Sequence, residues 1–165
     1  MGIASIWSEG KGFLDYIALR KRLSDDYVII MVGVNSAEIA KLPDGIIGIR
    51  RTQSAQELAE LYSASDIVLS LSRAETFGLT VAEGMACGTP AVVYNNTAVP
   101  ELITSNTGLV VDKTGDIDGV IKAIETIVEQ GKQSYSEACR KRAEEHFDKK
   151  KCCEKYIDLY DEILV

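Results

Sequence analysis

The sequence has little histidine, no CxxC pair and no excess of positive charge. One histidine and four cysteines in this arrangement provide neither a typical zinc site nor a disulfide framework, which indicates reduced thiols and no bound metal. The 25 acidic residues outnumber the 18 basic ones, and the formal net charge of -7 argues against a nucleic-acid partner. The sequence also shows no secretory signal pattern and no apolar run near the roughly 20 residues of a membrane helix. We therefore expect a cytoplasmic chain for which membrane association is not indicated.

What the sequence does have is a regular alternation of short apolar runs and helical patterns. Its 165 residues, 46% of them hydrophobic, suit one globular domain. Strands are expected at 2–7, 27–34, 46–49, 66–71, 91–94 and 108–111, and helices at 12–23, 36–42, 54–63, 78–87, 100–103 and over most of the remainder. Such alternation predicts an α/β fold: a Rossmann-like parallel sheet of about six strands with helices on both faces.

The loops that follow the expected strands are predicted to crowd one edge of the sheet. In a parallel sheet the carboxyl ends of all strands reach the same edge, and ligands bind there. Lys11 follows the first strand and Glu75 follows the fourth. Arg50 and Arg51 follow the third. We therefore expect these four side chains to be neighbours despite their separation in the sequence.

The most informative stretch is residues 72–90, SRAETFGLTVAEGMACGTP, in which seven residues separate Glu75 from Glu83. Gly78 and Thr80 are expected to open a helix, and helix starts carry unpaired N–H groups and the positive end of the helix dipole. A diphosphate can bind there without many cationic side chains. Carboxylates that accept hydrogen bonds from hydroxyl groups suit sugars. The stretch therefore predicts a site for a phosphate-bearing sugar.

Residues 57–103, ELAELYSASDIVLSLSRAETFGLTVAEGMACGTPAVVYNNTAVPELI, resemble the core of the retaining glycosyltransferases of family 4, which have the GT-B architecture. The segments SEGKGFLDYIALRKRL, YVIIMVGV and YIDLYDEIL fit as well, so the resemblance covers nearly the whole chain. It implies the C-terminal, donor-binding half of a GT-B fold. Residues 1–165 would then form a single nucleotide-sugar-binding domain, without the acceptor-binding N-terminal domain.

The resemblance also implies roles for individual residues. Glu75 would be the catalytic-site carboxylate that binds hydroxyls of the donor sugar, and Glu83 would hold the ribose of the nucleotide. Lys11 would neutralise the diphosphate leaving group, and the main chain around Arg51 would flank the nucleobase. Further donor contacts would come from the start of the helix, at Thr76, Phe77, Gly78, Leu79 and Thr80. No metal and no cofactor are implied, and the donor would be a nucleoside-diphosphate sugar, with UDP expected ahead of GDP or ADP.

Three places depart from the pattern of that family. Ser5 stands where many members have an arginine, and Gly10 stands where a basic residue often precedes the lysine. Thr97 and Ala98 replace a common Gly-Gly pair. The absent acceptor domain would have to act in cis or in trans, so we expect this chain alone to bind nucleotide sugar and to transfer little or nothing. A location at the inner face of the membrane would depend on that domain.

The resulting hypothesis is the donor domain of a hexosyltransferase-type enzyme that moves a sugar to an acceptor hydroxyl in polysaccharide or glycolipid synthesis. A non-catalytic nucleotide-sugar binding module, or remnant of a GT-B protein, is the alternative. An epimerase of the same architecture would need a histidine near the donor, and the single His146 is far along the chain from the motif. A receiver domain would need an aspartate at the end of the third strand, where Ile49 and Arg50 stand.

Overall fold

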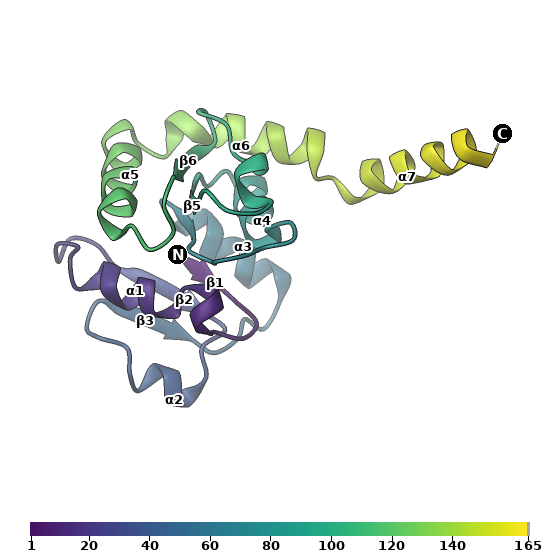
Figure 1. Ribbon diagram of the computed structural model, residues 1–165. Helices are drawn as coiled ribbons and strands as arrows, with labels where there is room; N and C mark the ends of the chain where they lie inside the picture. Colours follow the sequence, from purple (N-terminus) through teal and green to yellow (C-terminus); the bar gives the residue numbers. More distant parts are fainter. Residues whose placement is uncertain (165) are drawn as a thin grey trace.

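The computed structural model describes residues 1–164 (Figure 1). The strands are β1 (Gly2–Ile3), β2 (Ile29–Val32), β3 (Ile46–Ile49), β4 (Val68–Ser70), β5 (Ala91–Tyr94) and β6 (Gly108–Val111). The α-helices are α1 (Phe13–Arg20), α2 (Ser36–Ile39), α3 (Ala55–Ala64), α4 (Leu79–Ala86), α5 (Ile117–Gln130), α6 (Gln133–His146) and α7 (Lys149–Leu164), and two 3-10 turns span Glu9–Lys11 and Val99–Leu102.

The strands form two parallel three-stranded ladders, β1-β2-β3 and β4-β5-β6, which Met1 joins. The amino nitrogen of Met1 donates to the carbonyl of Ile67 at 2.7 Å, and the N–H of Leu69 donates to the carbonyl of Met1 at 2.8 Å. The spatial order is therefore β3-β2-β1-β4-β5-β6. The chain moves outward in opposite directions from β1 and from β4, so the carboxyl ends of these two strands flank the topological switch point where ligands of such sheets bind.

Helices cover both faces of the sheet, as predicted. Helices α1 and α5 contact each other on one face, while α4 contacts both α3 and α6 on the other (Figure 1). Because both faces are covered, β4 and β5 consist of buried residues throughout, and the polar Ser70 at the end of β4 is buried as well. The predicted α/β fold with a parallel sheet is confirmed.

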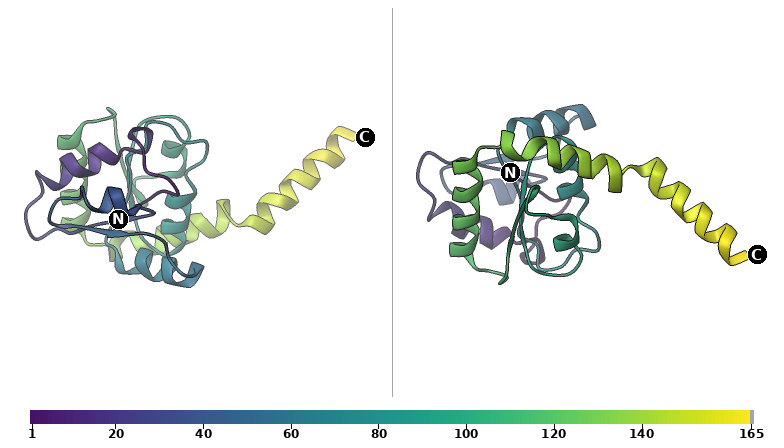
Figure 2. Two further views of the ribbon diagram at one scale, coloured as in Figure 1. Left: turned by 90° about the horizontal axis from the view of Figure 1, so that it is seen from below. Right: turned by 90° about the horizontal axis from the view of Figure 1, so that it is seen from above.

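Helix α7 differs from the other helices because it extends away from the rest of the molecule (Figure 2). Apart from the half-buried Cys152, its side chains are exposed, including the large apolar Tyr156 at 65% and Ile157 at 59%. No helix among residues 1–164 combines the length and the apolar character that a membrane crossing requires.

The element boundaries agree best with the sequence at β3, β5 and β6, which match the predicted ranges. The first strand is shorter than predicted, because it ends at Ile3. Trp7 is buried although it lies outside the sheet: its Nε1 donates to the carbonyl of Val32 at 3.0 Å, and its ring packs edge-on against Tyr16. The apolar residue Trp7 is therefore buried without strand pairing, whereas Ile6 is 75% exposed.

Candidate functional site

The loops after β1 and β4 are in direct contact at the switch point. The N–H of Arg73 donates to the carbonyl of Gly10 at 2.8 Å. Gly12, at the start of α1, adopts a left-handed φ of 74°, and a Cβ atom there would approach the carbonyl oxygen of Leu71 to 2.2 Å. Only glycine fits this conformation and this spacing. The local sequence therefore holds the two loops together through their backbones.

A buried polar cluster lies beneath these loops. Asp15 on α1 accepts hydrogen bonds from the hydroxyl of Tyr94 at 3.0 Å and from the guanidinium of Arg73 at 3.4 Å. Burial, together with the nearby charge of Asp15, raises the pKa of Tyr94, so the hydroxyl remains a donor at ordinary pH. Arg73, which resembles a surface charge in the sequence, instead ties the loop after β4 to α1.

Glu75 and Lys11 come together as predicted from the sheet topology. Lys11 Nζ lies 2.6 Å from Glu75 Oε1, and the side chains are 38% and 20% exposed. The pair joins the loops after β1 and β4 across 64 positions of sequence. It places one positive and one negative group at the same point of the carboxyl edge, where a ligand with both phosphate and hydroxyl groups would meet complementary partners.

Thr97, in the loop after β5, holds the backbone at Glu75, a role that the sequence did not reveal. Its Oγ1 accepts a hydrogen bond from the N–H of Glu75 at 2.9 Å. Thr97 adopts a left-handed φ of 46°, which is uncommon for a β-branched residue. This is the position at which the resemblance expects a glycine. The threonine keeps the conformation that glycine favours and adds an acceptor for the neighbouring loop.

The start of α4 lies at the carboxyl edge of the sheet, after the loop that follows β4. Gly78 is the N-cap residue, with φ 98°, and has no side chain with which to cap the helix. Leu79 is 67% exposed and Phe77 is 40% exposed, and Thr76 is exposed as well. Thr80 is half-buried. Gly78 is buried, and the ring of Phe77 packs edge-on against Phe147 at a centroid distance of 5.6 Å. The helix start thus has no side-chain cap and has the exposed side chain of Leu79 beside it, and an uncapped helix start is the arrangement that anions favour.

Glu83 lies in α4, more than one turn beyond the start of that helix. A residue of the neighbouring helix α3 donates a hydrogen bond to its carboxylate. The hydroxyl of Tyr62 donates to Glu83 Oε2 at 2.9 Å. The ring of Tyr62 is 1% exposed, whereas Glu83 is exposed. A buried donor therefore orients a carboxylate that faces solvent. At helical spacing Tyr62 resembles an ordinary core residue, so the sequence alone did not indicate this contact.

Arg51 lies farther along the same edge of the sheet. It follows β3, which is three strand spacings from β4, or about 14 Å. The structure thus brings Lys11 to Glu75 but places Arg50 and Arg51 apart from them, so the prediction that all four are neighbours holds only for the first pair. Arg51 lines a hollow of about 500 Å³ between the loop after β3 and α3, together with Thr52, Gln53, Ser54, Ala55 and Leu58.

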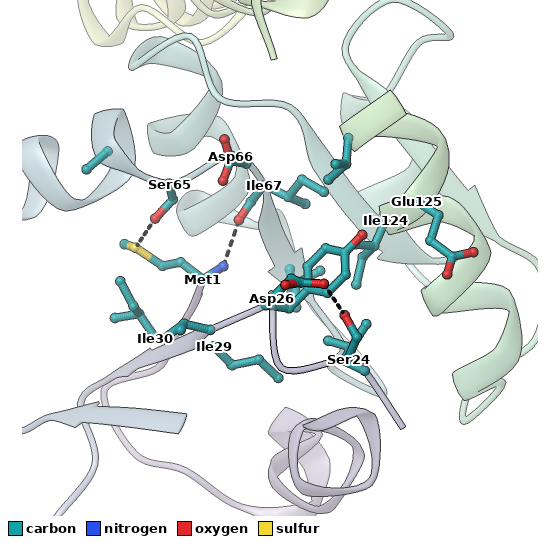
Figure 3. Close-up of a pocket in the computed structure, with 16 residues that line it drawn as sticks. Met1, Ser24, Asp26, Ile29, Ile30, Ser65, Asp66, Ile67, Ile124 and Glu125 are labelled. Atoms are coloured by element: carbon teal, nitrogen blue, oxygen red, sulfur yellow. Dashed lines mark hydrogen bonds between the residues drawn. The ribbon is translucent and has the colours of Figure 1, made fainter. Parts of the chain in front are cut away.

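Another hollow, of about 660 Å³, lies at the opposite, amino edge of the sheet (Figure 3). Its apolar walls include Ile29, Ile67 and Ile124, and its rim carries the carboxylates of Asp26, Asp66 and Glu125. None of the residues predicted to bind a donor lines it. Among residues 1–164, no group of three or more histidine, cysteine, aspartate and glutamate side chains is placed to hold a metal ion.

Comparison with known proteins places the chain in a family. The family model described as glycosyl transferases group 1 matches residues 10–146. A GDP-mannose-dependent alpha-(1-6)-phosphatidylinositol dimannoside mannosyltransferase from Mycobacterium tuberculosis is 37% identical over 87 residues, which are 53% of this chain and 22% of that protein. An N-acetyl-alpha-D-glucosaminyl L-malate synthase from Bacillus anthracis is 34% identical over 111 residues, covering 65% of this chain and 29% of that protein.

Solved structures show the same fold along nearly the whole chain. A glycosyltransferase from Rickettsia africae matches with a TM-score of 0.84 and 25% identity, over 99% of this chain and 47% of that one. Anabaena HepE, solved in complex with UDP, matches with a TM-score of 0.82 and 20% identity, over 98% of this chain and 48% of that one. The chain thus spans about half the length of these structures. It belongs to the glycosyl transferases group 1 family.

Proposed function

We propose that this chain is the nucleotide-sugar-binding domain of a retaining glycosyltransferase of family 4, the C-terminal half of a GT-B enzyme. The complete protein would transfer a hexose from a nucleoside diphosphate, with UDP ahead of GDP or ADP, to an acceptor hydroxyl in polysaccharide or glycolipid synthesis. It would act in the cytoplasm or at the inner face of the membrane. The acceptor would bind to an N-terminal domain supplied in cis or in trans.

The observation that carries this proposal is the uncapped start of α4 beside the Lys11–Glu75 pair. The amides from Phe77 to Thr80 would bind the diphosphate, and Lys11 would turn from Glu75 to a phosphate oxygen. The helix dipole and the ammonium group would then stabilise the negative charge that develops on the leaving diphosphate, without a metal ion. Glu75, released from Lys11, would accept hydrogen bonds from hydroxyls of the sugar.

The nucleoside would extend from the same point toward α3. Glu83 would accept hydrogen bonds from the ribose hydroxyls, and the hollow beside Arg51 would take the base. The donor specificity of the Mycobacterium tuberculosis relative for GDP-mannose and the UDP found in the Anabaena structure support a nucleotide ligand of this class. Transfer itself requires both reactants to be held in register, and therefore the second domain.

Calorimetric titration with UDP-glucose, GDP-mannose and ADP-glucose tests the proposal. We expect one of them to bind, and we expect Glu83→Ala to weaken that binding at least about tenfold, because a charged acceptor is lost. Glu125→Ala is the matched control, since it removes another exposed helix glutamate at the amino edge of the sheet. Equal affinity of both variants, or no binding of any nucleotide sugar, would contradict the proposal.

A further inference from the structure

Glu83 depends on a contact that fixes its orientation. An exposed glutamate on a helix samples several rotamers, and binding a ligand through it requires that freedom to be lost. The hydroxyl of Tyr62 occupies Oε2 at 2.9 Å and leaves Oε1 available. Burial, and secondarily the charge of Glu83, raise the pKa of Tyr62, so this hydroxyl stays protonated and can only donate to the carboxylate.

Tyr62 itself is held rigidly. Its carbonyl accepts a buried hydrogen bond from Thr89 Oγ1 at 2.7 Å, which ties the end of α3 to the segment after α4. A Cβ atom at Gly84, the neighbour of Glu83, would lie 2.5 Å from Val68 and 3.4 Å from the Tyr62 ring. Glycine therefore lets α4 pack close to Tyr62 and β4. The donor that orients Glu83 belongs to the core, whereas Glu83 belongs to the surface.

The position of Tyr62 also connects two parts of the proposed site. Leu58 lines the hollow beside Arg51, and Tyr62 lies four residues later, on the same face of α3. A nucleoside with its base in that hollow would have its ribose near the next turn of α3, where the Tyr62 hydroxyl meets Glu83. One helix face would thus support both the base hollow and the ribose-binding carboxylate.

We propose that Tyr62 is a positioning residue that presents Glu83 to the vicinal hydroxyls of a nucleotide ribose. The inference rests on the proposed function. It assigns to a buried tyrosine, which contacts no ligand, a part in selecting ribonucleotides over nucleotides that lack these hydroxyls. The ring provides core packing in any case, but the hydroxyl group is the part that serves recognition.

A thermodynamic cycle that combines a Tyr62 variant with a ligand lacking the ribose hydroxyls separates core packing from recognition. UDP and 2′,3′-dideoxy-UDP are titrated against the wild type and Tyr62→Phe, with the guanosine pair run alongside. We expect the variant to bind UDP about tenfold more weakly, because one charge-assisted hydrogen bond is lost, and to bind the dideoxy nucleotide within about twofold of the wild type. In Tyr62→Phe combined with Glu83→Ala, the loss should not exceed that of Glu83→Ala alone.

Tyr135→Phe is the matched control. Tyr135 is 3% exposed and donates its hydroxyl to Gln130 Oε1 at 2.7 Å within the C-terminal helices, so its loss should leave both affinities unchanged. Equal weakening of both nucleotides in Tyr62→Phe, or no weakening of either, would overturn the positioning role while leaving the proposed function intact. Failure of the wild type to bind any nucleotide would overturn both.

Discussion

The two edges of the sheet present different surfaces. The amino edge has the larger hollow, of about 660 Å³, with apolar walls and an acidic rim (Figure 3). The carboxyl edge has the smaller hollow beside Arg51, of about 500 Å³, and its loops after β1, β4 and β5 are joined by hydrogen bonds. There Lys11 and Glu75 lie 2.6 Å apart beside the uncapped start of a helix.

In the proposed function the ligand binds at the edge with the smaller hollow, so the volume of a hollow would be a poor guide to where a charged ligand binds. A phosphate-bearing sugar requires oriented donors and acceptors, and the carboxyl ends of β1 and β4 supply both because the chain reverses its direction of crossover there. The amino edge offers volume and negative charge, which a diphosphate would avoid. Variants at the carboxyl edge, and one pair of lysines that spans both edges, test this difference.

The packing between the loops after β1 and β4 should be the most sensitive feature. Gly12→Ala places a Cβ atom 2.2 Å from a backbone oxygen at a left-handed φ, so we expect the unfolding free energy to fall by about 3 kcal/mol or more. Gly115 has φ 81° but nothing within 4 Å of the new atom, so Gly115→Ala should cost only about 1 kcal/mol. Urea denaturation measures both variants, and equal losses would show that the clash is relieved by movement of the loops.

One lysine at each edge separates binding from stability: the variant at the carboxyl edge should affect UDP binding, and the variant at the amino edge should affect the unfolding free energy. Lys11→Met should weaken UDP binding about tenfold and reduce its salt dependence, because a charged phosphate partner is lost. Its unfolding free energy should change by less than about 0.5 kcal/mol, since the pair is partly exposed.

Lys132 is the counterpart at the amino edge, where its Nζ donates to the carbonyl of Ser65 at 2.7 Å and to that of Ser63. Lys132→Met should therefore lower the unfolding free energy by about 1 kcal/mol and leave UDP affinity unchanged. Calorimetric titration and urea denaturation of both variants provide the comparison. If Lys132→Met impairs binding as strongly as Lys11→Met, the two edges are not functionally distinct.

Arg51 should show the smallest effect. Its side chain is exposed, and the proposed contact with the base involves the main chain, so Arg51→Ala should change nucleotide affinity by less than about threefold. The preference between UDP and GDP should be retained. A loss of thirtyfold or more, or a reversal of that preference, would assign base recognition to the guanidinium group.

The sequence predicts the parts of this molecule in which local pattern and topology agree. The strands β3, β5 and β6 are short apolar runs with glycine or proline at or just before their first residue, and they match the predicted residues. The contact between Lys11 and Glu75 follows from the common edge at which parallel strands end.

Other features depend on packing that no local pattern contains. Trp7 has the apolar character of a strand residue but packs beside α1, and Tyr62 has the spacing of a core residue but donates to Glu83. The pairing of Arg73 with Asp15 spans 58 positions of sequence. The left-handed backbone of Thr97 is unexpected because glycine is the residue that favours it. Side-chain hydrogen bonds between distant elements are thus the part of the site that requires the structure.

The central claim is that nucleotide sugar binds at the carboxyl edge of the sheet. Titration of the isotope-labelled chain with UDP-glucose, followed by amide chemical shifts, tests it most directly. We predict that the largest shifts fall on residues 10–12 and 76–80, with little change at Ile29, Asp66 and Ile67. Shifts concentrated at those three residues, around the hollow of the amino edge, would contradict the account.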